Sequence, residues 1–245
     1  AQNIIKCCNQ SGLDVEDIVL EPLSSSQAVL SPDEQEVGVV LVDIGGGTTD
    51  VTIYSEGSIV HTSVLALGGN HLTHDIAIGL GAPLREAEDI KHKYGVAMAS
   101  MVEEDEMIDV PSVGGRNNRT MQKKVLASII EDRFREIFEL IAHEIEKTHF
   151  HTLMASGVVI TGGTCIMSGA DRLASQVLNL PVRVGYPENI SGLREMIYSP
   201  KYATSVGLVR YGITSNQGKL NFVGDDTNLF HKVSRRMKDW MQDFF

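Results

Sequence analysis

The sequence predicts an α/β fold in which the strands of one buried sheet are joined by turns and helices. A continuous apolar run at 37–42 is typical of a strand that is buried on both faces of a sheet. A glycine-rich turn leads from this run into a return strand at 51–54, and Glu56-Gly57 turns the chain into a third strand at 58–66. Strand, glycine turn and helix then recur at 157–179, so strands and helices alternate a second time.

Further helices and strands complete the predicted organisation. Hydrophobic periodicity predicts helices at 1–11, 22–30, 69–94 (with a break at 81–83), 120–149 and 200–213. Strand-like segments are expected at 17–20 and 101–113. The polar stretch 214–228 is typical of a flexible linker, and a last amphipathic helix is expected at 229–245.

Composition limits the classes of function. The net charge of −11 argues against a general nucleic-acid binder, which needs a basic surface to displace counterions from phosphates. Cys7, Cys8 and Cys165 have neither zinc-site spacing nor a disulfide pattern, which favours a reducing cytoplasm. No set of carboxylates or cysteines accompanies the eight histidines to form a metal site, so we interpret them as surface residues. The chain has no signal-peptide pattern, and it begins like the middle of a domain, so we expect further sequence upstream.

The first glycine turn, residues 43–50, is the strongest candidate site. Glycines let the backbone press against a ligand, and successive N–H groups in such a turn form an anion-binding concavity. Two hydroxyls could add donors, so the candidate anion-binding residues are Gly45, Gly46, Gly47, Thr48 and Thr49. Asp43 is placed to hold Mg²⁺ through water, as this ion prefers when it bridges phosphates. The alternative is a tight hairpin with Asp43 and Asp50 as turn formers.

Two weaker motifs follow. Gly162 and Gly163 end the second buried strand, where the backbone could approach a ribose or an adenine closely. Glu88 and Lys91 lie one helical turn apart and therefore share a face, so they could bracket the same groups. Taken alone, Glu88 and Lys91 are better interpreted as a surface ion pair.

Together these motifs resemble the second lobe of the superfamily that contains actin, sugar kinases and seventy-kilodalton chaperones. In that superfamily the acidic glycine hairpin is the "phosphate 2" loop and the Gly-Gly turn is the "adenosine" motif. The Glu88–Lys91 pair resembles the helix that contacts adenosine, and Gly68 and Gly69 resemble a further glycine pair near the nucleotide. The resemblance implies ATP and Mg²⁺ as ligands.

The resemblance narrows to the FtsA family of cell division proteins. Its marks are residues 111–116, Gly68-Gly69-Asn70, residues 202–208 and the terminal helix. It implies an actin-like (ribonuclease H-like) inner subdomain at 1–66 and 155–213, with an inserted outer α+β subdomain at 67–154. Family members also have a first lobe with a "phosphate 1" turn and a small subdomain used in self-association, and neither is present in this sequence.

The last predicted helix has the pattern of a membrane-surface anchor. Its apolar positions recur every three or four residues, and basic residues outnumber acidic ones on its other faces. Large apolar side chains flanked by bases are typical of a helix that lies in the interface of an anionic membrane. A helix packed back onto the domain, or a coiled-coil arm, is the alternative. The stripe consists of Leu229, Phe230, Val233, Met237, Trp240, Met241, Phe244 and Phe245.

The resemblance also implies partners and a location. In the FtsA family the outer subdomain receives the C-terminal tail of FtsZ, and Arg116, Arg133 and Glu136 fall at matching positions; their plain interpretation is a solvated charged face. We therefore expect a peripheral protein on the cytoplasmic face of the bacterial inner membrane, which self-associates and tethers FtsZ. ATP would be a structural or switching ligand, with slow or absent hydrolysis. The alternatives are a nucleotide-binding lobe of a kinase, an ATPase or a chaperone, or a PilM-like pilus assembly adaptor.

Overall fold

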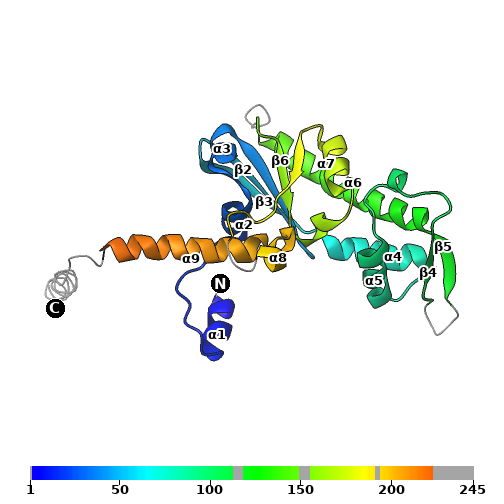
Figure 1. The fold of residues 1–245 in the computed structure, drawn as a ribbon, viewed down its shortest axis with the longest axis horizontal. Coiled ribbons are helices and arrows are strands. Elements are labelled where there is room, and N and C mark those ends of the chain that lie inside the picture. Colours follow the sequence, from blue (N-terminus) through cyan, green and yellow to red (C-terminus); the bar gives the residue numbers. More distant parts are fainter. Residues whose placement is uncertain (1, 113–117, 149–154, 191–193, 223–245) are drawn as a thin grey trace. The chain divides into compact units, whose positions relative to one another are not determined.

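A five-stranded mixed sheet forms the centre of the protein (Figure 1). In the computed structural model, its strands are β1 (Val39–Ile44), β2 (Thr49–Ser55), β3 (Ser58–Leu65), β6 (Val158–Thr161) and β7 (Val182–Val184), in the order β3-β2-β1-β6-β7. β1 pairs antiparallel with β2 and parallel with β6. The predicted central strand, hairpin and second strand are therefore present.

The structure describes residues 2–112, 118–148, 155–190 and 194–222. The chain divides into two units, residues 1–208 and 209–245, and the sheet and the site described below belong to the first unit.

β1 is buried on both faces, as its apolar run predicts. All six of its residues are buried, and they alternate between two clusters of side chains. Val40, Val42 and Ile44 pack into the larger cluster, whereas Val39 and Leu41 pack into the smaller one with α2 (Glu21–Val29). The sheet is therefore covered on each face next to β1.

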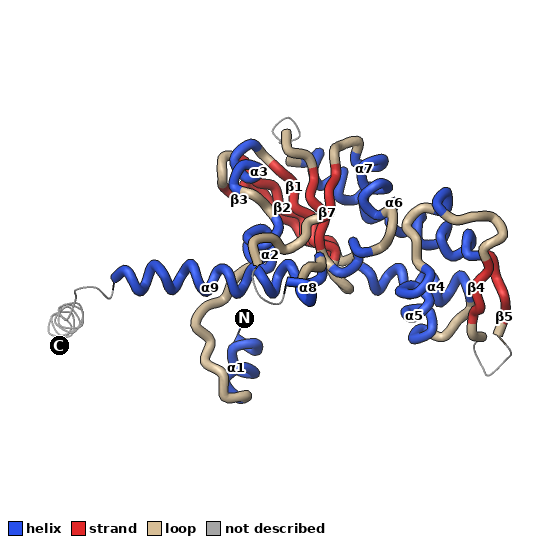
Figure 2. Tube along the Cα trace, viewed as in Figure 1, coloured by secondary structure: helices blue, strands red, loops and turns tan. Residues whose placement is uncertain are grey.

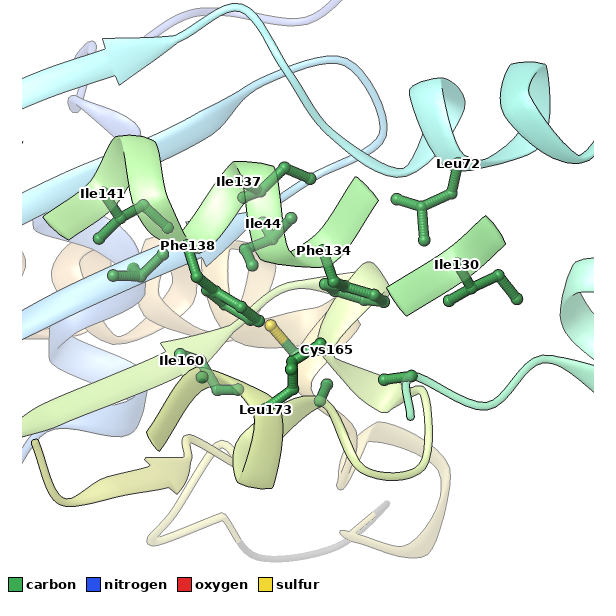
Figure 3. Close-up of a cluster of buried hydrophobic side chains, with 14 of the residues drawn as sticks. Ile44, Leu72, Ile130, Phe134, Ile137, Phe138, Ile141, Ile160, Cys165 and Leu173 are labelled. Carbon is green, nitrogen blue, oxygen red and sulfur yellow. The ribbon is translucent and has the colours of Figure 1, made fainter. Parts of the chain in front are cut away.

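The larger cluster joins the sheet to a long helix, α6 (Lys123–Lys147), and to α7 (Ala170–Leu178). Phe134 and Phe138 of α6 stack with ring centroids 5.7 Å apart. In Figure 3, α6 side chains point toward Ile44, Ile160, Cys165 and Leu173 from the strands and the following segments. Burial of these large side chains stabilises the lobe by about 1.5–3 kcal/mol each.

The N-terminal half of α6 continues into a second group of elements. This group consists of α4 (Gly69–Leu80), α5 (Leu84–Tyr94) and a separate two-stranded sheet of β4 (Met107–Val110) and β5 (Arg119–Gln122), visible together in Figure 2. Leu72 and Ile76 of α4 share the larger cluster with Leu126 and Ile130 of α6. One continuous core therefore runs from the sheet to the helices that follow the first glycine turn.

The remaining elements complete the described chain. They are α1 (Gln2–Gln10), α3 (Pro32–Val37), η1 (Ala99–Met101), η3 (Gly163–Ile166), α8 (Arg194–Ile197), η4 (Pro200–Tyr202) and α9 (Ala203–Phe222). In the described part of the chain, no helix combines the length and the apolar character that crossing a membrane requires.

The structure differs from the predicted elements at three places. Residues 17–20 form no strand and belong to neither sheet of the described chain, and Ile18 and Leu20 are 53% and 67% exposed. The predicted strand at 101–113 is reduced to β4, and the predicted long helix starts at Lys123, because residues 119–122 pair with β4. α9 continues to Phe222, into the segment predicted as a linker.

Substitutions of a buried and an exposed isoleucine test whether packing in the larger cluster stabilises the fold. Ile137 on α6 is 0% exposed, whereas Ile78 on α4 is 76% exposed. We expect Ile137→Ala to lower the free energy of unfolding by about 2–5 kcal/mol, because it leaves a cavity in the larger cluster. Ile78→Ala should change it by less than about 0.5 kcal/mol. Urea unfolding followed by circular dichroism measures both, and equal losses would contradict this description of the core.

Candidate functional site

The first glycine turn connects β1 to β2 at one edge of the sheet. The antiparallel register pairs Asp43 with Asp50 and Ile44 with Thr49, so the two strands stay paired up to the turn. The Gly45 N–H donates to the Thr48 carbonyl at 2.9 Å and closes the turn. The turn is thus a tight hairpin that projects from a buried strand.

The carbonyl groups of this turn are held from outside the hairpin. The Gly69 N–H donates to the Gly45 carbonyl at 2.9 Å, and the Asn70 N–H donates to the Gly46 carbonyl at 2.7 Å. Within the described chain, the Gly46 and Gly47 N–H groups donate to no acceptor. Carbonyls that are bonded and amides that are free make the turn able to accept an anion.

The glycine pair before α4 makes this contact possible. A Cβ at Gly68 would lie 2.7 Å from the Gly45 carbonyl oxygen, and one at Gly69 would lie 2.6 Å from Thr164 Oγ1. Only glycine lets the backbone of the α4 N-terminus come this close to the turn.

The second glycine turn lies beside the first because β6 runs parallel to β1. Asp43 and Thr161 are partners in this register, and Gly162 follows directly. Gly162 has φ +92°, and a Cβ there would lie 2.4 Å from the Ile44 carbonyl oxygen. Glycine is therefore needed here both for backbone conformation and for space.

Glu88 and Lys91 form part of a buried network instead of an isolated surface pair. Lys91 is 8% exposed, and its Nζ donates to Glu88 Oε2 at 2.7 Å, Thr73 Oγ1 at 2.8 Å and the Gly69 carbonyl at 3.0 Å. Partial burial alone would raise the pKa of Glu88, but hydrogen bonds from Lys91 and Thr73 outweigh it and lower the pKa. The network ties α5 to the N-terminus of α4.

A cavity of about 430 Å³ lies between these motifs. It brings together five of the predicted residues, from four motifs separated in the sequence: Gly46, Gly69, Glu88, Lys91 and Gly163. Its other lining residues were missed by the sequence analysis: Asn70, His92, Gly95, Thr164, Ile166, Met167, Ser168 and Lys201. Asn70 and Thr164 directly follow glycine pairs, which is a signal that could have found them. Gly45, Gly47, Thr48 and Gly162 belong to the same turns without lining the cavity.

Asp43 is 5% exposed at the end of β1. Burial raises the pKa of its carboxyl, although the Ser25 hydroxyl, which donates to Asp43 Oδ2 at 2.7 Å, acts in the opposite direction. Burial, followed by the charges of Glu21 and Asp43, raises the pKa of Asp50 to about 6. Among the described residues, no three histidine, cysteine or acidic side chains could together ligate a metal. Asp43 therefore stands at the end of β1 as a single buried carboxylate, directly before the first glycine turn.

The two threonines of the first turn have different surroundings. Thr48 is exposed, whereas Thr49 is fully buried and its hydroxyl donates to the Leu67 carbonyl at 2.8 Å. The predicted donor role of Thr49 is therefore corrected, because its single proton is engaged inside the protein. Only the Thr48 hydroxyl of the pair is exposed.

The predicted partner-binding residues are only partly described. Arg133 and Glu136 share one face of α6 and form an ion pair, and Arg133 Nη2 also donates to Asp75 Oδ1 at 3.0 Å. These side chains line a shallow depression of about 290 Å³ with Ile129 and Asp132. Arg116 and the predicted membrane-facing residues of 229–245 lie outside the described residues.

The chain matches a known protein family over most of its length. The family model "Cell division protein FtsA" matches residues 40–207. The chain is 41% identical to the cell division protein FtsA of Pseudomonas aeruginosa and 39% identical to that of Escherichia coli K12. Both matches cover all of this chain and 60% of the relative, so the chain spans about 60% of the length of these relatives.

Solved structures confirm the predicted actin-like α/β fold. MreB5 of Spiroplasma citri bound to ADP matches with a TM-score of 0.70 at 19% identity, over 90% of this chain and 67% of the other. A PilM–PilN type IV pilus biogenesis complex matches with a TM-score of 0.65 at 16% identity, over 86% of this chain and 57% of the other. At these identities the likeness concerns the fold alone. Because the family model covers more than half of the chain, the chain belongs to the FtsA family.

Proposed function

We propose that this chain is the nucleotide-binding lobe of a cell division protein in which ATP is a structural or switching ligand. The observation that carries the proposal is the convergence of Gly46, Gly69, Glu88, Lys91 and Gly163 on one cavity. Four separate motifs meet there, and each resembles a nucleotide-contacting motif of the actin superfamily. MreB5, a protein with the same fold, has been solved with ADP and with AMPPNP bound.

The cavity and the turn residues beside it would each have their own task. The free N–H groups of Gly46 and Gly47, together with the exposed Thr48 hydroxyl, would bind phosphate oxygens. Asp43 would hold Mg²⁺ through water beside those phosphates. Glu88 and Lys91 would face the ribose, while the Gly163 backbone would allow close approach of the adenosine. Bound Mg²⁺ would supply charge that neutralises the phosphates.

The proposed ligand role is structural because the four motifs come from different elements. A ligand that binds only the folded arrangement stabilises it by mass action. We therefore propose that nucleotide binding sets the assembly state of the protein, and that any hydrolysis is slow.

The same proposal includes a tether between FtsZ and the membrane. It is supported by membership of the FtsA family and by the apolar stripe at 229–245 with its flanking bases. The protein would lie on the cytoplasmic face of the inner membrane, self-associate there, and hold the FtsZ tail through its outer subdomain.

We propose that the FtsZ tail binds in the depression beside Arg133. Arg133 already pairs with Asp75 and Glu136, so a carboxylate of the tail would have to compete with two carboxylates of this chain. Arg116 would add a second cation to the same partner, as the family resemblance implies.

The adaptor function is tested by co-sedimentation with anionic liposomes in the presence of a labelled FtsZ tail peptide. The whole chain should pellet with the peptide, and a chain ending at Gly224 should leave both in solution. Pelleting without the peptide would support the anchor and overturn the proposed partner. If neither version pellets, the membrane anchor is wrong.

Gly46→Ala tests the phosphate-binding turn. A Cβ at Gly46 would lie 3.5 Å from Asn70 Oδ1, an ordinary contact, so the fold should tolerate the substitution. The methyl group would stand beside the free amides, and we expect ADP or ATP affinity to fall about tenfold or more, because hydrogen bonds to charged phosphates weaken. Isothermal titration measures the affinity.

Gly212→Ala is the matched control for Gly46→Ala. A Cβ at Gly212 would meet no atom within 4 Å, and this residue lies in α9 outside the cavity. The Gly212→Ala variant should bind ADP or ATP with the same affinity as the wild type. Wild-type affinity in Gly46→Ala would contradict the proposed phosphate site.

A pair of charge-matched double variants tests the anchor. Trp240→Glu with Phe244→Glu places two carboxylates on the apolar stripe. We expect this variant to lose liposome binding, because it costs free energy to place charged side chains among the lipid tails. His231→Glu with Gln242→Glu adds the same charge off the stripe and should retain most of the binding. Sedimentation with anionic vesicles measures both, and equal loss in the two variants would mean that net charge alone governs binding.

A further inference from the structure

The side chain of Thr164 links the two glycine turns of the cavity. Thr164 lies in η3, directly after the second turn, and its Oγ1 donates to the Gly45 carbonyl at 2.9 Å. These residues are 119 positions apart in the sequence. Thr164 is half-buried and lines the cavity, so its hydroxyl stands where the turns meet.

The Gly45 carbonyl has two donors, which come from different elements. One is the Gly69 N–H at the start of α4, and the other is the Thr164 hydroxyl of η3. A carbonyl oxygen has two lone pairs, so both of its acceptor positions are filled. The Gly69 backbone also lies against Thr164, because a Cβ on this glycine would approach Oγ1 to 2.6 Å.

We propose that Thr164 is a positioning residue of the nucleotide site, whose hydroxyl holds the first glycine turn in the conformation that leaves the Gly46 and Gly47 amides free. This inference rests on the proposed nucleotide site and assigns to it a residue that the sequence motifs above did not include. The link acts on phosphate binding, because its acceptor belongs to the turn that presents those amides. The same hydrogen bond also joins the second glycine turn to the first, so that a movement of one turn would move the other.

The consequence of losing the link can be separated from unfolding. In Thr164→Val the side chain keeps its shape and loses the hydroxyl, while the Gly45 carbonyl keeps the Gly69 donor. The core should therefore remain intact. Thr164→Ser keeps the hydroxyl and should behave as the wild type.

The first measurement needs no nucleotide. Amide hydrogen exchange, followed by NMR, should accelerate about three- to tenfold at Gly69 and Asn70 in Thr164→Val, because a neutral hydrogen bond that holds their acceptors is lost. It should be unchanged in Thr164→Ser and in Thr62→Val, a control at an exposed position of β3. Unchanged exchange in Thr164→Val, or acceleration in Thr164→Ser, overturns the proposal.

The second measurement compares ligands. Thr164→Val should weaken the binding of ADP with Mg²⁺ about three- to tenfold and leave that of adenosine unchanged, since only ADP uses the first turn. Equal weakening of both ligands would show a general disturbance of the cavity and overturn the positioning role. If the wild-type chain binds neither ligand, the proposed nucleotide site fails, and the exchange measurement still decides whether Thr164 holds the turn.

Discussion

The burial of β1 on both faces is the constraint on which the rest of the lobe depends. Its six residues are buried, and successive side chains enter opposite clusters, so a shift of one residue would exchange the two cores. The register with β2 and β6 is thereby fixed, and with it the place where β1 ends. Asp43 and the first glycine turn are positioned by apolar packing several residues away.

The parallel pairing of β1 and β6 places the two glycine turns beside each other at the cavity. Because β1 and β6 run in the same direction, their carboxyl ends lie at one edge of the sheet, and each continues into a glycine turn. The segment between β1 and β6 contains β2, β3 and the whole second group of elements, and it returns to the first turn at the start of α4, through Gly69 and Asn70. The cavity thus lies between segments that topology, and not sequence proximity, brings together.

Local patterns predicted the features that depend on a single element. The apolar run of β1 and the glycine turns were identified because burial on two faces and close backbone approach leave direct marks in the sequence. The spacing of Glu88 and Lys91 correctly placed them on one face, but the hydrogen bonds of the buried Lys91 to Thr73 and Gly69 depend on another helix. Ile18 and Leu20 have a strand-like pattern, yet a strand requires a partner edge. Thr48 and Thr49 are adjacent and identical, and only the pairing of β2 decides which hydroxyl is engaged.

The distribution of contacts around the cavity bears on how a ligand would act. Gly46 belongs to the β1–β2 turn, Lys91 to α5 and Gly163 to the start of η3, and each of these elements reaches the larger core cluster separately. A ligand that contacts all three would favour the arrangement in which they are close, and the free energy of this preference grows with ligand concentration. Four of the thirteen residues that line the cavity are glycines, and the buried ammonium of Lys91 lies among polar side chains beside them. A nucleotide held in this way would therefore act on the protein chiefly through the conformation that it stabilises.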